Sequence, residues 1–80
     1  MNTNDVLALK DSAVAEVAAA TDLAGLDALR VKYLGRNGLL PQIMAAIKDV
    51  PPADKKLFGQ TANTFKNDVQ AAVDARKEVL

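Results

Sequence analysis

The last third of the chain carries a heptad pattern, and this pattern limits the possible folds more than any other feature of the sequence. Small or apolar side chains recur there at alternating spacings of four and three residues. The stripe consists of Phe58, Ala62, Phe65, Val69, Ala72 and Val79, with Arg76 as its one polar member. Such a stripe needs at least one other helix to cover it, so it predicts a coiled-coil helix. Because the stripe still runs at Val79, with no glycine or proline after it, we expect the last helix to be cut from a longer one.

Residues 5–20 and 22–34 are also predicted to be helical. The first segment is rich in alanine, and its expected apolar stripe contains Leu7, Val14, Val17 and Ala18, with Val6 and Ala13 beside it. The second has a stripe of Leu23, Leu26, Leu29 or Arg30, Tyr33 and Leu34. A break is expected at Thr21 and Asp22, which suit a helix start. The alternative is one continuous helix over residues 4–34.

A corner is predicted where the second helix ends. Gly35 is expected to adopt a positive φ just beyond that end. Asn37 and Gly38 form a dipeptide that is typical of tight turns, and Pro41 suits the first turn of the next helix.

A short helix is expected over residues 41–49, with Ile43, Met44 and Ile47 facing inward. Two prolines at 51 and 52 end it, because a residue before proline is pushed out of the helical region. Pro52 is expected to open the last helix, with Asp54 in its first turn.

These elements predict one all-α domain over residues 1–80. We expect three or four helices, with the last helix pairing antiparallel to an earlier one as a coiled-coil arm. The sequence has no cysteine and no histidine, and no set of nucleophile, base and metal ligands can be named in it. Its apolar runs are all shorter than the roughly 20 residues of a membrane span, so we expect a soluble cytoplasmic protein without a membrane partner.

Charge is balanced overall but unevenly distributed. Five acids and one base lie in residues 1–27, whereas residues 28–48 hold four bases and no acid. The four bases of this basic segment are Arg30, Lys32, Arg36 and Lys48. Arginine can contact a phosphate through two N–H groups and lysine offers a point charge, so the segment is a candidate for phosphate binding. The alternative is an ordinary solvated face.

Two further side chains have more than one interpretation. Tyr33 could stack on a base, or it could be a core aromatic with its hydroxyl at the surface. Arg76 lies on the heptad stripe, where a long side chain can cover apolar surface and still reach water.

Three runs of residues resemble the start of the bacterial phenylalanyl-tRNA synthetase α chain. Residues 30–38 match an Arg-x-x-Tyr-Leu-Gly-Lys-Lys-Gly run, except that Asn37 replaces the second basic residue. Residues 50–54 match a Leu-Pro-Pro-Glu-like hinge, and residues 59–66 match a Gly-Gln-x-x-Asn-x-x-Lys run in which Phe65 replaces a smaller aliphatic residue. The resemblance extends over essentially all eighty residues.

This resemblance implies a tRNA-binding coiled-coil arm with no catalytic residue, cofactor site or metal site of its own. The implied full-length enzyme is a class II aminoacyl-tRNA synthetase that attaches phenylalanine to its tRNA using ATP and magnesium. It pairs with a β chain in an (αβ)₂ tetramer. The expected tRNA-binding residues are Arg30, Lys32, Arg36, Lys66 and Arg76. The alternative function is a protein–protein module that docks a partner helix on the heptad stripe.

Overall fold

Four α-helices and one short 3₁₀ segment make up the protein, for which a computed structural model describes residues 2–80. The elements are α1 (Thr3–Ala19), α2 (Leu23–Leu34), α3 (Leu39–Ala46), the 3₁₀ segment η1 (Ile47–Asp49) and α4 (Lys55–Val79). No strand occurs in the described residues. The predicted all-α class and the number of helices are therefore confirmed.

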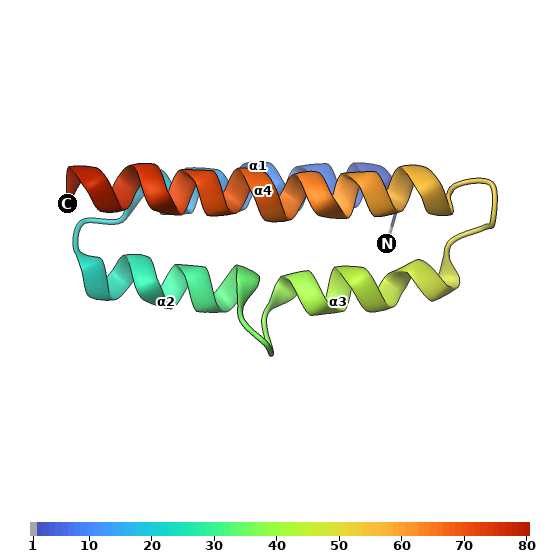
Figure 1. Ribbon diagram of the computed structural model, residues 1–80, viewed down its shortest axis with the longest axis horizontal. Coiled ribbons are helices and arrows are strands. Elements are labelled where there is room, and N and C mark those ends of the chain that lie inside the picture. Colours follow the sequence, from blue (N-terminus) through green and yellow to red (C-terminus); the bar gives the residue numbers. More distant parts are fainter. Residues whose placement is uncertain (1) are drawn as a thin grey trace.

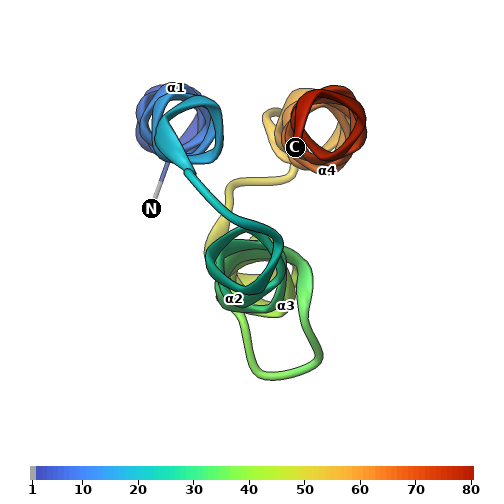
Figure 2. The ribbon, with the colours of Figure 1, turned by 90° about the vertical axis from the view of Figure 1, so that its left-hand side faces the viewer.

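The helices form three rods that lie side by side along the length of an elongated bundle. α1 and α4 are one rod each, and α2 and α3 follow one another as the third rod (Figure 1). Viewed from the end, the three rods form a triangle (Figure 2). The principal extents of 42 × 19 × 14 Å describe an arm rather than a sphere.

α4 pairs in both directions within this bundle. The rod of α2 and α3 runs antiparallel to it, as expected from the sequence (Figure 1). α1 runs parallel to it, because Lys10 pairs with Asp68 while the carbonyl of Ala20 meets Arg76 farther along both helices. α4 therefore packs against one parallel neighbour, α1, as well as the antiparallel neighbour that the sequence predicted.

Two local hydrogen bonds fix the start of α1. The Asn2 side chain accepts a hydrogen bond from the Asp5 N–H, and the Asp5 carboxylate accepts one from the Asn2 N–H, each at 2.9 Å. This reciprocal pair is a capping box. It explains why the helix begins two residues earlier than the sequence predicted.

The buried stripe of α1 differs from the predicted one. It contains Val6, Ala13 and Val17, and Ala20, the residue after the helix, is also buried. Leu7 is 37% exposed and Ala18 is also exposed, so their inward placement was wrong. In a helix this rich in alanine, neighbouring stripes are similarly apolar, and the position of α4 decides which one is buried.

The predicted break between the first two helices is confirmed. The Asp22 carboxylate caps α2 by accepting a hydrogen bond of 2.6 Å from the Gly25 N–H. Leu26 and Tyr33 are the buried residues of α2, whereas Leu23 is 53% exposed because it lies in the first turn, at the end of the bundle.

Gly35 ends α2, but not by the predicted positive φ. Its φ is −70° and its ψ is 169°, which is extended backbone. Glycine is required there for space, because a Cβ on Gly35 would lie 2.5 Å from the Val31 carbonyl oxygen. The expected turn is present over residues 35–38, closed by a hydrogen bond of 2.9 Å from the Gly38 N–H to the Gly35 carbonyl.

α3 starts before the predicted position, and Pro41 lies in its first turn as expected. Ile43 is fully buried and Ile47 packs against the core, but Met44 is 55% exposed. Ile43 and Ile47 are four residues apart and share one face, whereas Met44 is rotated by about 100° from Ile43. The inward placement of Met44 was therefore wrong.

α4 begins at Lys55, three residues after Pro52. Residues 51–54 first form a turn, in which the Asp54 N–H donates to the Pro51 carbonyl at 2.8 Å. Asp54 is consequently the residue before the helix and not part of its first turn, and its side chain makes no capping hydrogen bond.

The heptad stripe of α4 is buried only over its first half. Phe58, Ala62, Phe65 and Val69 are fully buried. Beyond them the most buried residue is Val73, which is not part of the stripe, and the stripe residue Val79 is 72% exposed. A straight helix has about 3.6 residues per turn, so a stripe with a 3.5-residue period drifts away from a fixed neighbour. No helix in the described residues is both long and apolar enough to cross a membrane.

Candidate nucleic-acid interface

The turn over residues 35–38 projects from the third rod on the side away from α1 and α4 (Figures 1 and 2). Arg36 and Asn37 are its two central residues, and both are exposed. Gly38 is buried because its backbone passes close to α2: a Cβ there would lie 2.7 Å from the carbonyl oxygens of Val31 and Lys32. The turn therefore presents a guanidinium to solvent on tightly packed backbone.

Arg30 lies one turn before the end of α2 and faces the side of α4. Its Nε and Nη2 donate to Oδ1 of Asp27 at 3.1 and 2.9 Å. Both side chains are substantially exposed, at 43% for Arg30 and 65% for Asp27. The guanidinium is therefore held by a neighbouring acid without being buried.

Lys32 points instead toward α1. Its Nζ lies 3.3 Å from Oε2 of Glu16 and 5.0 Å from the centre of the Tyr33 ring. The Tyr33 hydroxyl donates to the same Glu16 oxygen at 2.7 Å. Arg30 and Lys32 face different neighbours and do not form one cluster, because side chains two residues apart on a helix do not share a face.

Glu16, Lys32 and Tyr33 shift one another's pKa values. The hydrogen bond from Tyr33 lowers the pKa of Glu16 below its ordinary value of 4.5, and Lys32 lowers it further. The hydrogen bond with Glu16 raises the pKa of Lys32. Burial raises the pKa of Tyr33, and its contact with Glu16 adds to that shift. At neutral pH the carboxylate and the ammonium are both charged and the phenol is a neutral donor.

Tyr33 belongs to the core. It is only 5% exposed, and its ring packs edge-on against Phe65 with the ring centres 6.4 Å apart. With one ring face under Lys32 and the hydroxyl on Glu16, the side chain is not presented to a base. The core interpretation of Tyr33 is the one that the structure supports.

The basic segment, residues 28–48, has no acid in its sequence but has acids beside it in space. Arg30 is paired with Asp27 and Lys32 with Glu16. Among the ion pairs of the described residues, none involves Arg36 or Lys48. The free positive charge of the segment is thus concentrated at the turn and at the end of the third rod.

The two candidates on α4 have different surroundings. Lys66 is exposed. Arg76 is half-buried, and its Nε donates to the Ala20 carbonyl at 2.8 Å. Because Ala20 follows the last residue of α1, Arg76 satisfies a carbonyl at a helix C-terminus, where positive charge is favourable.

The acidic partners of the basic side chains were missed from the sequence. Asp27 and Arg30 are three residues apart, a spacing at which helical side chains meet, so this pair was open to prediction. Glu16 and Tyr33 come together only because α2 folds back beside α1. No local pattern signals that contact.

The chain matches the family model described as the class II aminoacyl-tRNA synthetase N-terminal domain, over residues 21–80. Relatives include phenylalanine–tRNA ligase alpha subunits. The protein from Staphylococcus epidermidis is 32% identical over 81 residues, covering 100% of this chain and 23% of the relative. That from Salmonella paratyphi B is 41% identical over 69 residues, covering 86% of this chain and 21% of the relative.

A third relative has the same name. The alpha subunit from Staphylococcus aureus strain Newman is 36% identical over 72 residues, which cover 90% of this chain and 20% of the relative. The chain therefore spans only about a fifth to a quarter of the length of the relatives it matches. No solved structure shows a significant match.

Proposed function

Since the chain belongs to the family of class II aminoacyl-tRNA synthetase N-terminal domains, we propose that it is the tRNA-binding arm of a phenylalanine–tRNA ligase α chain. The observation that carries the proposal is the exposed basic turn. Arg36 is one of its two central residues, and Arg30 and Lys32 precede it on α2, where they face α4 and α1 respectively. The family match and this charge distribution support the same function.

The arm acts on the tRNA backbone. Exposed arginine and lysine side chains contact phosphates whatever the base sequence, which gives affinity and orientation. Arg30, Lys32 and Arg36 are the principal contacts. Lys66 is a secondary contact on α4, and Arg76 contributes mainly through its bond to Ala20, which keeps α1 and α4 in place.

The rest of the enzyme is part of the same proposal. The relatives are named phenylalanine–tRNA ligase alpha subunits, which supports a longer protein that attaches phenylalanine to its tRNA. We further propose that this protein is cytoplasmic and uses ATP and magnesium, as the family resemblance implies. Residues 1–80 are its N-terminal domain, the catalytic domain lies farther along the α chain, and a β chain completes an (αβ)₂ tetramer.

Nothing in this segment is assigned to ATP or magnesium. The described residues contain no group of three or more His, Cys, Asp or Glu side chains placed to hold a metal ion. The carboxylates at the candidate interface are engaged by Arg30, Lys32 and Tyr33. The role that we propose for the segment is tRNA binding.

The alternative, a module that docks a partner helix on the heptad stripe, has less support. Phe58, Phe65 and Val69 are fully buried by the chain's own helices. A partner would have to displace α1 or the third rod to reach them. The exposed end of the stripe at Val79 alone is too small for a stable interface of about 800 Å² per partner.

A salt titration tests the proposed function. The chain is mixed with phenylalanine tRNA and, as a control, with a neutral polymer, and affinity is measured at several salt concentrations. We expect tRNA binding whose logarithm falls linearly with the logarithm of salt concentration, by roughly 0.7 to 0.9 per phosphate contacted. Binding that is absent, or that does not change with salt, contradicts the proposal.

A further inference from the structure

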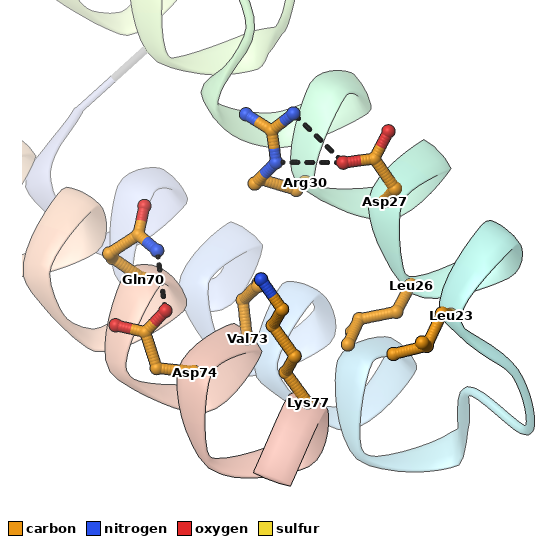
Figure 3. Close-up of a pocket in the computed structure, with 8 residues that line it drawn as sticks. All are labelled: Leu23, Leu26, Asp27, Arg30, Gln70, Val73, Asp74 and Lys77. Carbon is orange, nitrogen blue, oxygen red and sulfur yellow. Dashed lines mark hydrogen bonds and ion pairs between the residues drawn. The ribbon is translucent and has the colours of Figure 1, made fainter. Parts of the chain in front are cut away.

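A groove of about 340 Å³ lies between α2 and α4. Its floor is apolar and is formed by Leu26 and Val73, which are almost fully buried, and by the exposed Leu23. Its walls are polar, and their residues are Asp27, Arg30, Gln70, Asp74 and Lys77 (Figure 3). The groove is therefore a place where side chains from two rods can act on one ligand.

The two acids of the groove are engaged differently. Asp27 accepts both hydrogen bonds from Arg30, on the wall formed by α2. Asp74 accepts a hydrogen bond of 3.0 Å from the amide of Gln70, on the wall formed by α4 (Figure 3). Lys77 belongs to no ion pair within residues 2–80. One acid thus neutralises a cation directly, whereas the other is occupied by a neutral group.

We propose that Asp27 competes with tRNA phosphate for Arg30, so that this acid limits how tightly the groove holds the RNA backbone. Lys77, on the opposite wall, is the second cation available to the same stretch of backbone. The inference rests on the proposed function and extends it: Arg30 binds RNA only when it leaves its internal partner.

The exchange is physically accessible because the ion pair is weak. It joins two exposed side chains one helical turn apart, and exposed pairs of this kind contribute little to stability. Asp27 contacts the guanidinium through a single oxygen, whereas a phosphate can accept two parallel N–H bonds. A bound phosphate therefore replaces the acid without loss of hydrogen bonds to Arg30.

The variant Asp27→Asn tests the competition, with Asp74→Asn as its matched control. Each change removes one negative charge from the same groove, but only the first frees an arginine. We expect Asp27→Asn to tighten binding of a phenylalanine tRNA transcript by about two- to five-fold, and Asp74→Asn to have a smaller effect. The salt dependence of Asp27→Asn should steepen by up to about 0.7 to 0.9, equivalent to one more phosphate contact.

Double variants separate competition from a general charge effect. With Arg30→Gln already present, Asp27→Asn should no longer tighten binding, and Lys77→Gln should weaken binding in the otherwise unchanged chain. Equal tightening by the two Asn variants would overturn the inference. So would weaker binding by Asp27→Asn, because the acid would then be orienting Arg30 for RNA.

Failure of this inference can be told from failure of the proposed function. If the unmodified chain binds tRNA with a clear salt dependence but Asp27→Asn does not tighten it, only the competition is wrong. If neither the chain nor Asp27→Asn binds tRNA at low salt, the tRNA-binding function is wrong and the competition with it. Circular dichroism of each variant confirms that the helices are retained.

Discussion

The face shared by α1 and α4 differs in kind from the third rod, formed by α2 and α3. Five of the thirteen apolar side chains that form the core of the described residues belong to α4, namely Phe58, Ala62, Phe65, Val69 and Val73. The third rod buries only Leu26, Tyr33 and Ile43 within its two helices. It carries the exposed basic turn and is tied to α1 partly by polar contacts through Glu16.

This difference separates stability from binding along the molecule. Burial of apolar side chains is the main favourable term in folding. Truncating a buried side chain of α4, the helix that contributes most of them, should therefore lower the free energy of unfolding most. Exposed charges contribute little to folding but dominate affinity for a polyanion. Changes in the two regions should therefore move different measurements.

The largest loss of stability is expected for Phe65→Ala. Phe65 is fully buried and contacts the Tyr33 ring, so its truncation leaves a cavity where α4 meets α2. Such changes cost about 3–5 kcal/mol, which is enough to unfold a small domain of modest stability. Thermal melts followed by circular dichroism measure the loss. Leu57→Ala is the control, because Leu57 is 54% exposed and its truncation should change the melt little.

Glycine substitutions compare the turn over residues 35–38 with the second turn of α4. Gly38→Ala would place a Cβ 2.7 Å from two carbonyl oxygens of α2, and crowding of this kind costs about 1–3 kcal/mol. At Gly59, inside α4, the nearest atom is Ile47 Cδ1 at 3.8 Å, so Gly59→Ala meets ordinary contact. It should stabilise the helix by about 0.5–1 kcal/mol. Denaturant unfolding that moves both variants in the same direction would contradict this account of the turn.

Tyr33→Phe should lower the melting temperature by a few degrees at neutral pH, because it removes the hydrogen bond to Glu16 but keeps the buried ring. The pKa of Glu16 is lowered in the folded state, so this contribution is present above the ordinary value of 4.5. It is lost as the pH falls below 4.5 through the lowered value. The gap between the two melting temperatures should thus narrow on acidification. A gap that widens below pH 4.5 would show that Glu16 is not the partner that matters.

Much of the fold follows from local patterns in the sequence. The break at Asp22, the turn at Asn37–Gly38 and the buried half of the α4 stripe were predicted, since capping, turn chemistry and heptad spacing are short-range properties. The buried side of α1 was missed because alanine gives little contrast between neighbouring faces. The extended backbone of Gly35 was missed because its constraint is a carbonyl of the preceding turn, 2.5 Å from where a Cβ would lie.

The sequence predicted which basic residues form the candidate site, but not which side chains and carbonyls they contact. Arg30, Lys32 and Arg36 stand out in a segment without acids. Their actual surroundings depend on tertiary contacts: Lys32 meets Glu16 across two helices, and Arg76 reaches the carbonyl of Ala20. Residues 16 or 56 positions apart in sequence carry no signal of such contacts in one sequence alone.

Replacing Arg30, Lys32 and Arg36 together by Gln should have the smallest effect on folding. All three are at least partly exposed, and exposed charges contribute at most about 1 kcal/mol each to stability. The control replaces Lys10, Lys55 and Lys56 by Gln, which changes the net charge equally but outside the basic segment. Both variants should keep their helical signal.

Binding of tRNA by Arg30, Lys32 and Arg36 is tested by the affinity of these two triple variants for phenylalanine tRNA, measured at several salt concentrations together with a thermal melt of each variant. We expect the variant at Arg30, Lys32 and Arg36 to bind more weakly, with a salt dependence that is flatter by roughly 0.7 to 0.9 per lost phosphate contact. Its melt should stay close to that of the unmodified chain, and the control should bind more like the unmodified chain. Unchanged affinity and salt dependence together with a collapsed melt would contradict the account, because these three residues would then hold the turn together rather than bind tRNA.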